Sequence, residues 1–239
     1  MRQAGRVVAL AKAVVARAIR PGVTTGELDR IAEEEIRRLG ATPSFKGYHG
    51  FPATICASIN EEIVHGIPGE RVVHDGDLLS VDIGAIVCGF HADSAFTVGV
   101  GQVSPEAQAL VDATRESLRR GIQQARAGAR IGDVSTAVQQ YAESKGYQVV
   151  RQYVGHGIGR ALHEDPPVPN YGLPGRGPVL REGMAIAIEP MLNMGTWQTK
   201  QLNDGWTVVT ADGSLSAHFE DTVGITERGT EVFTASLVA

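Results

Sequence analysis

The sequence predicts an α+β protein made of two similar halves related by an approximate twofold axis. Segments with helical periodicity and short apolar strands recur in the same order along the 239-residue chain. The stretch 21–40 aligns with 127–146 at an offset of 106, and three glycines of each stretch match. We expect halves at about 1–104 and 105–239, forming a single domain over 1–239.

The helices are predicted from apolar spacing and from glycine and proline at their ends. Residues 6–20 carry Val, Leu and Ala at helical spacing and stop at Pro21-Gly22. Residues 105–126 show the same pattern and stop at Ala127-Gly128. After each helix, a glycine-bounded turn leads into an amphipathic helix of about four turns, within 21–40 and within 127–146.

The strands repeat as well, and each repeat carries an acid. DGDLLSVD (75–82) resembles EGMAIAIE (182–189), which matches Asp82 with Glu189. HADSAFTVG (91–99) resembles HFEDTVGIT (218–226), which matches Asp93 with Glu220. Each half is therefore expected to contribute one carboxylate from a strand and a second one just after a histidine.

These acids are expected to meet. Residues 80–98 predict a β-hairpin that turns near 87–89. A turn centred between 87 and 88 would place Asp82 directly opposite Asp93, with Cβ atoms about 4.5–5.5 Å apart. Two carboxylates at that distance repel each other. With Glu189 and Glu220 brought in by the pseudo-twofold, four acids call for a multivalent cation, and they suit a pair of divalent ions.

A nitrogen ligand is expected from YVGHGIGRALHEDP (153–166), where His156 lies between two glycines that leave room for its imidazole. Oxygen ligands with one nitrogen favour Mn, Fe or Co, with Zn also possible. Each residue alone has a simpler interpretation. Asp82 could mark a bulge or a capped turn, Glu189 a strand end before Pro190, and His156 a hydrogen-bonded loop. The duplication of the acids in both halves favours metal binding.

The composition excludes several classes of protein. The chain is 43% hydrophobic and 21% charged, and its net charge of −5 argues against nucleic-acid binding. Its two cysteines, Cys56 and Cys88, form no metal-spaced pair and suit a reducing compartment. Lys12 interrupts the first apolar stretch, so no signal-peptide core is expected. We therefore expect a cytoplasmic protein with no membrane contact and no nucleic-acid site.

Five motifs in order resemble the type I methionine aminopeptidases of the short bacterial sort. These motifs are CASINEEIVHGIP (56–68), DIGAIVCGFHAD (82–93), GHGIGRALHEDP (155–166), AIEPM (187–191) and SLSAHFEDTV (214–223). The resemblance runs from about residue 4 to residue 233. It implies a pita-bread fold, in which an antiparallel sheet carries helices on its outer face and the site lies between the two halves.

The resemblance also implies a role for each metal ligand. Asp82 would chelate one ion through both oxygens, Asp93 and Glu220 would bridge two ions, and His156 and Glu189 would complete the other. The ions would be two divalent metals drawn from Co, Mn, Fe, Ni or Zn. Glu189 is also the candidate acid and base in hydrolysis of the first peptide bond.

Substrate contacts follow from the same resemblance. His65 would lie near the scissile amide and the substrate amine, and His163 would donate a hydrogen bond to the peptide carbonyl. An apolar slot for the methionine side chain would be lined by Tyr48, Phe51, Cys56, Leu162 and Trp206, with Phe45 at its edge. Leu162 replaces an expected aromatic residue. Asn60, Glu62 and Ser216 occupy places where relatives hold a monovalent cation such as Na or K.

The activity implied is removal of the initiator methionine from nascent proteins and peptides, with a small second residue preferred. Nascent chains as substrates imply transient contact with ribosomes, and we expect a monomer. Two alternatives remain open at the level of sequence. One is an Xaa-Pro aminopeptidase or prolidase, which shares the fold and the five ligands. The other is a metal-free pita-bread module for protein interaction, which the presence of all five ligands disfavours.

Overall fold

The computed structural model describes residues 1–235 and contains four long helices. They are α1 (Arg2–Ala18), α2 (Thr25–Arg38), α3 (Pro105–Gln124) and α4 (Ile131–Ser144). All four predicted helices are thus confirmed. The start of α2 is fixed by a capping box, in which the Thr24 side chain accepts from the backbone of Glu27 and the Glu27 side chain accepts from the backbone of Thr24. The side chain of Ser104 caps α3 in a similar way.

The strands pair antiparallel throughout the described residues. Those of the first half are β1 (Thr42–Pro43), β2 (Ile55–Ile59), β3 (Glu62–Val64), β4 (Leu78–Val87) and β5 (Phe90–Gly99). The second half contributes β6 (Gln148–Val149), β7 (Gly155–Gly157), β8 (Glu164–Val168), β9 (Ala185–Ile188), β10 (Met191–Asn193), β11 (Thr199–Gln201), β12 (Val208–Thr210), β13 (Ser216–His218), β14 (Asp221–Thr226) and β15 (Gly229–Val232). A short 3-10 turn, Tyr48–Gly50, precedes β2.

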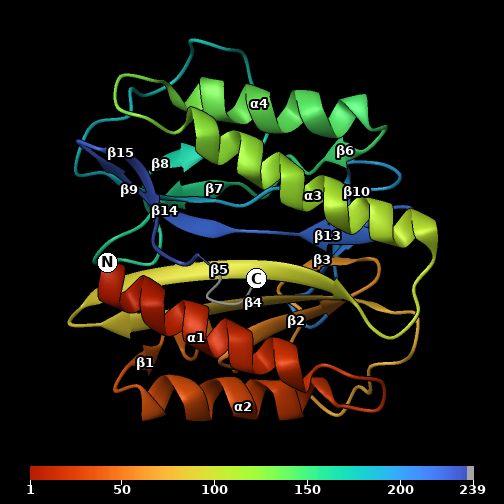
Figure 1. The fold of residues 1–239 in the computed structure, drawn as a ribbon. Coiled ribbons are helices and arrows are strands. Elements are labelled where there is room, and N and C mark those ends of the chain that lie inside the picture. Colours follow the sequence, from red (N-terminus) through yellow and green to blue (C-terminus); the bar gives the residue numbers. More distant parts are fainter. Residues whose placement is uncertain (236–239) are drawn as a thin grey trace.

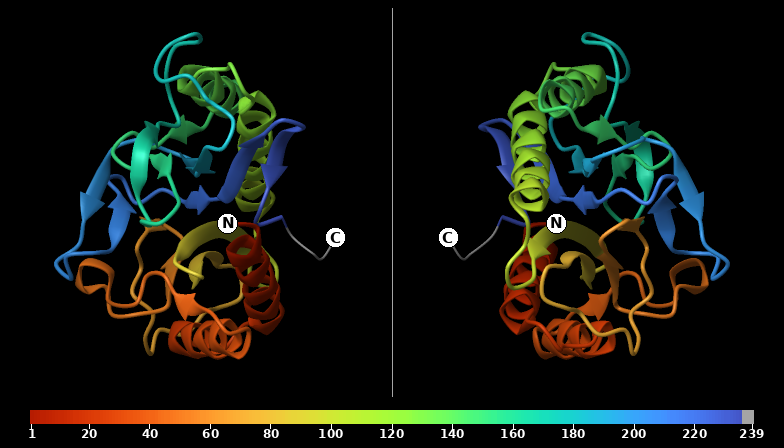
Figure 2. Two further views of the ribbon diagram at one scale, coloured as in Figure 1. Left: turned by 90° about the vertical axis from the view of Figure 1, so that its left-hand side faces the viewer. Right: turned by 90° about the vertical axis from the view of Figure 1, so that its right-hand side faces the viewer.

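The strands lie between the helices of the two halves (Figure 1). The first half holds the order β1-β4-β2 with β5 paired to β4, and the second half holds the order β15-β14-β9-β7-β8. Side views place α2 and α4 at opposite ends of the molecule, with the strands in the middle (Figure 2). This arrangement, with helices outside and strands inside, is the predicted α+β architecture.

The predicted twofold relation between the halves is visible in matching backbone contacts. Thr24 bridges to Val72 in the first half, and Arg130 bridges to Val179 in the second. The amide of Gly26 donates to Gly69 O at 2.8 Å, and the amide of Gly132 donates to Arg176 O at 2.9 Å. A Cβ at either glycine would approach backbone atoms to 2.9 Å or less. These matched glycines are thus explained by the close approach of a loop to each helix start.

The β4–β5 hairpin corrects one prediction. The turn consists of Cys88 and Gly89, with φ angles of 50° and 75°, as a two-residue turn of the primed type requires. Asp82 is therefore paired with Ala95 and Asp93 with Gly84, so the expected direct pairing of Asp82 with Asp93 is wrong by two residues. Since a shift of two residues conserves the face, both carboxylates still project from the same side of the hairpin.

The two halves are joined where β5 meets the segment before β14. The amide of Ala95 donates to Glu220 O at 3.2 Å, and the amide of Glu220 donates to Ala95 O at 3.0 Å. Thr222 Oγ1 accepts from the amide of Asp93 at 3.0 Å. Thr97 Oγ1 accepts from the amide of His218 and donates to its carbonyl, both at 2.8 Å. This seam places acids from both halves side by side.

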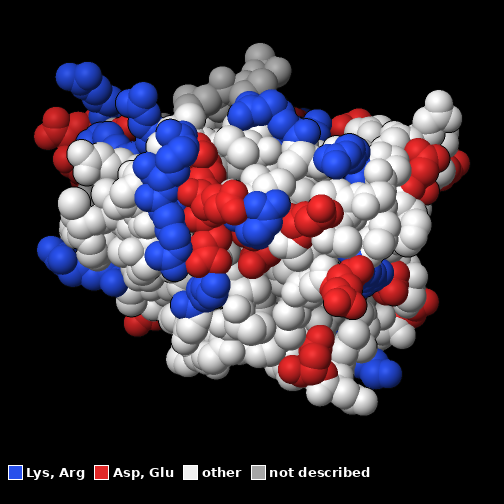
Figure 3. All heavy atoms as spheres, turned by 90° about the horizontal axis from the view of Figure 1, so that it is seen from below, with Lys and Arg blue, Asp and Glu red and all other residues white. Residues whose placement is uncertain are grey.

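The helices cover the outer side of the strands with apolar side chains, and their other sides carry ion pairs. Leu28 and Ile36 of α2 and Leu110 of α3 are fully buried, each stabilising the fold by about 1.5–3 kcal/mol relative to exposure. Basic side chains lie beside acidic ones on the face of the molecule that includes α2 (Figure 3), where Arg30 pairs with Glu34. No helix within residues 1–235 is long and apolar enough to cross a membrane.

Candidate metal centre

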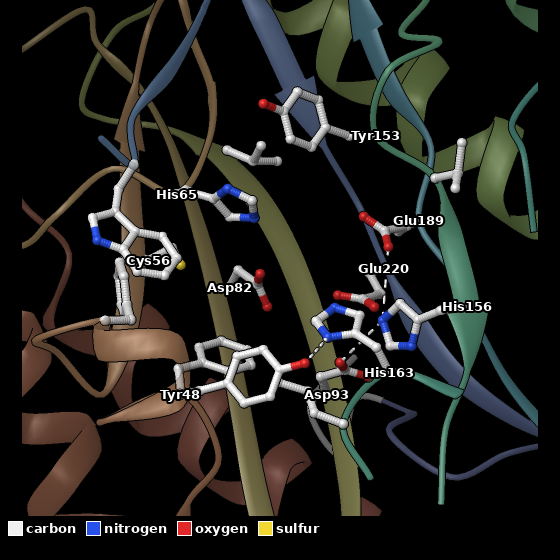
Figure 4. A pocket seen from close by; sticks show the side chains of 16 residues that line it. Tyr48, Cys56, His65, Asp82, Asp93, Tyr153, His156, His163, Glu189 and Glu220 are labelled. Atoms are coloured by element: carbon white, nitrogen blue, oxygen red, sulfur yellow. Dashed lines mark hydrogen bonds and ion pairs between the residues drawn. The ribbon is translucent and has the colours of Figure 1, made fainter. Parts of the chain in front are cut away.

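Four carboxylates from both halves, two of them buried and two partly buried, converge on one pocket (Figure 4). Asp82 comes from β4 and Asp93 from β5, while Glu189 follows β9 and Glu220 lies between β13 and β14. Asp93 and Glu220 are each only 3% exposed. The structure therefore brings together all four acids that the internal repeat singled out.

Mutual repulsion and burial shape the electrostatics of these acids. Burial raises the pKa of Asp82 well above its usual range, and the charge of Asp93 adds to this effect. Burial, followed by the charges of Asp82 and Asp93, likewise raises the pKa of Glu189. The pKa of Glu220 rises for the same reasons, with burial first. Such a cluster is unfavourable as free carboxylates and becomes favourable once cations neutralise it.

Asp93 is the most strongly held of the four. Burial raises its pKa, and the partially opposing influences are His156 and a hydrogen bond from Thr222. Thr222 Oγ1 lies 3.0 Å from Asp93 Oδ1. This leaves Oδ2 directed toward His156, at 3.6 Å from its Nε2. Asp93 thus has one oxygen bound to the protein and one facing the pocket.

His156 is oriented by its own strand. Its Nδ1 lies 2.9 Å from Gly157 O, which holds Nδ1 as the protonated nitrogen and leaves Nε2 facing the acids. A Cβ at Gly155 or Gly157 would come within 2.3 Å of backbone atoms of neighbouring strands. The glycines on both sides of His156 therefore let β7 pack tightly, which seats the imidazole in the pocket wall.

The donor set fits divalent metal ions. Ligand atoms of Asp93, His156 and Glu220 all lie within 4.8 Å of one another. Asp82 and Glu189 lie outside that tight group but line the same pocket, and Asp82 Oδ1 is buried without any hydrogen-bond partner among residues 1–235. A buried, unpaired carboxylate oxygen beside other buried acids is the feature that a bound cation would satisfy. Four carboxylates and one imidazole match the ligand preference of Mn²⁺, Fe²⁺ or Co²⁺.

Two further histidines face the centre. His65 follows β3 with a φ angle of 62°, and its ring lies edge-on to Tyr153 at 5.6 Å between centroids. His163 lies 4.2 Å from the ring of His156. Burial, with a smaller influence of His156, lowers the pKa of His163 to about 4, and burial also lowers the pKa of His65. Both imidazoles are therefore neutral near pH 7.

Tyr48 fixes the orientation of His163. Its hydroxyl oxygen lies 2.7 Å from His163 Nδ1. When the hydroxyl donates to Nδ1, the single proton of the neutral imidazole is on Nε2. Since Tyr48 binds Nδ1, Nε2 is the nitrogen left to donate to a substrate. The sequence placed Tyr48 in the apolar slot only, so this polar contact is an addition from the structure.

The residues expected to form an apolar slot line a pocket beside the acids. The pocket has a volume of about 180 Å³. All six slot residues predicted from the sequence line it: Phe45, Tyr48, Phe51, Cys56, Leu162 and Trp206. The rings of Phe51 and Trp206 meet edge-to-face at 5.0 Å between centroids. Burial raises the pKa of the Cys56 thiol well above its ordinary value, so it remains an uncharged part of the wall.

Other residues near the site are not indicated by the motifs. Val64, Tyr153 and Val154 also line the pocket. Tyr153 and Val154 directly precede the motif GHGIGRALHEDP (155–166), so their position in the sequence could have indicated that they lie near the site. His218 lies 3.7 Å from Glu189 Oε2 through its Nε2. Nothing local in the sequence indicated that contact, because it depends on strand pairing.

The residues considered for a monovalent cation lie close together. The amide of Ser216 donates to Asn60 O at 2.9 Å. Glu62 is engaged elsewhere: its Oε2 accepts from the amide of Ile59, and its Oε1 pairs with Arg71. The side chain of Asn60 bonds Asp77 and Leu78. A cation there would therefore rely on backbone oxygens and the Ser216 hydroxyl, and the site stays a prediction.

The fold and the metal centre define a class of metal-dependent hydrolase, and the comparisons with known proteins agree. The model of metallopeptidase family M24 matches residues 1–227. The chain therefore belongs to metallopeptidase family M24.

Similar proteins narrow the class. The chain is 54% identical over 234 residues to a methionine aminopeptidase of Clostridium perfringens, covering 98% of this chain and 94% of the relative. It is 53% identical over 234 residues to methionine aminopeptidase 1 of Bacillus subtilis, with the same coverage. The crystal structure of a methionine aminopeptidase from Thermotoga maritima superposes with a TM-score of 0.97 at 47% identity, covering 99% of this chain and 95% of that chain.

Proposed function

We propose that this chain removes the N-terminal methionine from peptides and proteins. The observation that carries the proposal is that one pocket holds both a buried cluster of metal-type ligands and a slot of aromatic, apolar and thiol side chains. A thioether packs well against aromatic rings and a soft thiol. The cluster lies next to the slot, so a methionine seated there presents its peptide bond to the acids.

The ligand roles proposed for the five residues are those that the motifs imply. Asp82 would hold one ion, His156 and Glu189 would hold the other, and Asp93 and Glu220 would contribute to both. Two divalent ions bound there would supply an activated water and polarise the scissile carbonyl. Support comes from the tight group formed by Asp93, His156 and Glu220 and from the unpartnered oxygen of Asp82.

Three side chains are assigned to proton transfer and positioning. Glu189 takes the proton of the attacking water and passes it to the leaving amine. His163 donates from Nε2 to the carbonyl oxygen as negative charge develops on it. His65, on the opposite wall of the pocket (Figure 4), contacts the scissile amide and the substrate amine.

Substrate choice follows from the slot and its surroundings. The slot takes the methionine side chain, and limited space beyond the first residue favours a small second residue. Leu162 is 3% exposed and packs with Phe45, Phe51 and Cys56. A leucine occupies less of the slot than an aromatic ring would. The depth of the slot therefore differs from that of a slot with an aromatic residue at position 162.

Several features of the biology complete the proposal. The divalent ions are Mn, Fe, Co, Ni or Zn, and a monovalent cation such as Na or K binds near Asn60, Glu62 and Ser216. Residues 1–239 form a single catalytic domain that works as a monomer in the cytoplasm. Its substrates include nascent chains, which bring it into transient contact with ribosomes. It binds no nucleic acid and makes no contact with a membrane.

The test uses metal-stripped protein with two peptides offered separately, Met-Ala-Ser and Ala-Pro-Ala, before and after Mn²⁺ or Co²⁺ is added. The expected result is release of free methionine only after metal is added, with the proline peptide intact. Cleavage of Ala-Pro-Ala would instead assign the chain to Xaa-Pro hydrolysis. No cleavage of either peptide by protein that has bound metal would contradict the catalytic role and favour an interaction module.

A further inference from the structure

His218 stands out as a buried histidine with an unsatisfied nitrogen. The residue is 2% exposed, and its Nε2 has no hydrogen-bond partner within residues 1–235. A buried polar atom without a partner is costly, so its presence calls for an explanation. The backbone of His218 is fixed by Thr97 Oγ1, which bonds both its amide and its carbonyl at 2.8 Å. These two bonds to the backbone of β13 hold the imidazole of His218 in its position.

The nearest charged group to this nitrogen is Glu189. His218 Nε2 lies 3.7 Å from Glu189 Oε2, and His156 Nε2 lies 3.8 Å from Glu189 Oε1. Two imidazoles thus flank the two oxygens of one carboxylate. The pairing of Met191 with His218 in β10 and β13 places His218 across from a residue two positions after Glu189. The separation exceeds an ordinary hydrogen bond by less than 1 Å.

We propose that His218 is a positioning residue, whose Nε2–H donates to Glu189 Oε2 and so directs Oε1 toward the ligand cluster. Imidazole donates from Nε2 both in its Nε2–H tautomer and in its protonated form. Residues that orient a ligating carboxylate in this way determine metal affinity without touching the metal. The inference rests on the ligand role proposed for Glu189.

The alternative is that His218 only fills space in the core. Two substitutions separate these roles. His218→Leu introduces an apolar side chain of similar bulk and removes the donor. His218→Gln keeps an amide N–H at a similar reach. If donation is what matters, the Gln variant resembles the wild type, whereas a packing role makes the two variants behave alike.

The experiment titrates Mn²⁺ into metal-free wild type and variants by calorimetry, with kcat and KM measured on Met-Ala-Ser. We expect His218→Leu to weaken Mn²⁺ binding about 10- to 100-fold, with kcat falling more than KM rises. His218→Gln should stay within about threefold of the wild type, by the same reasoning. The control Thr114→Val removes a buried hydroxyl on α3, which donates to Leu110 O, and should leave Mn²⁺ binding unchanged.

The visible absorption of Co²⁺-loaded protein gives a second readout, because it reports the geometry around the metal. A changed spectrum in His218→Leu, restored in His218→Gln, supports the inference. Wild-type affinity and spectrum in a folded His218→Leu variant would overturn it, as would equal losses in the Leu and Gln variants. If His218→Leu does not fold, His218→Asn, whose amide is too short to reach Glu189, takes its place.

Glu189→Gln separates this inference from the proposed function. Weak Mn²⁺ binding by Glu189→Gln together with unchanged binding by His218→Leu would overturn the positioning role alone. Wild-type binding by Glu189→Gln would overturn the ligand role of Glu189 and the positioning role with it.

Discussion

The hydrogen bond between Tyr48 and His163 offers a sharp test of how the oxyanion donor is held. The Tyr48 hydroxyl oxygen lies 2.7 Å from His163 Nδ1, and both residues line the pocket. Tyr48→Phe deletes only the hydroxyl and keeps the ring that lines the slot. A single hydrogen bond of this kind contributes about 0.5–1.5 kcal/mol. If all of it acts by presenting Nε2–H to the carbonyl, kcat on Met-Ala-Ser should fall about 2- to 13-fold.

The assay compares four proteins: wild type, Tyr48→Phe, His163→Ala and the double variant. His163→Ala alone should lower kcat by about 10²–10³ because it removes the donor itself. If Tyr48 acts only through His163, the double variant should be no slower than His163→Ala. Tyr147→Phe, a partly buried tyrosine that packs against the main core, serves as the matched control.

Two results would refute this reasoning. An equal loss from Tyr48→Phe in the wild-type and His163→Ala backgrounds would show that the hydroxyl acts independently of His163. A rise in KM with unchanged kcat would reassign the hydroxyl to substrate binding.

Three other predictions follow from the acids and from an ion pair behind them. Asp93→Asn should abolish turnover and weaken Mn²⁺ binding while leaving a folded protein, so near-normal activity would contradict its bridging role. Asp82→Asn should raise the melting temperature of the metal-free protein at pH 8, because burial and Asp93 raise the pKa of Asp82 in the folded state and ionisation therefore costs folding free energy. That advantage should vanish below about pH 3, where the carboxyl is protonated in both the folded and the unfolded state, and an advantage that persists there would refute the electrostatic cause. Lys12→Met should lower the melting temperature by about 6–12 °C, because losing one partner of a largely buried ion pair lowers the free energy of unfolding by about 3 kcal/mol. In that pair Lys12 Nζ lies 3.6 Å from Asp221 Oδ1. Adding Asp221→Asn should recover part of that loss in the same thermal melt, and a further drop would argue against the pairing.

Much of the fold could be predicted because it repeats. The glycines at 26 and 132 recur because each half needs a loop carbonyl close to a helix start, and the structure shows that contact in both halves. The acids recur because β5 of the first half pairs with the segment before β14 of the second half, so each half contributes acids to the same centre. A pattern that arises from a duplicated physical requirement can be found from one sequence.

The details that escaped prediction depend on turn geometry and on pairing between distant strands. The predicted register of the hairpin is wrong because Cys88 adopts a positive φ angle, which is rare for a residue with a side chain. The centre of the turn therefore lies one residue later than expected. The approach of His218 to Glu189 depends on the pairing of β10 with β13. The contact of Tyr48 with His163 joins residues 115 positions apart. Local sequence signals carry no information on such contacts.

The central claim is that five side chains from both halves hold two divalent ions. Anomalous diffraction at the manganese edge, from crystals of the Mn²⁺-loaded protein, tests it most directly. We predict two adjacent peaks, one beside Asp82 and the other beside His156 and Glu189, with Asp93 and Glu220 contacting both. Peaks elsewhere, or none beside these residues at saturating Mn²⁺, would contradict the claim.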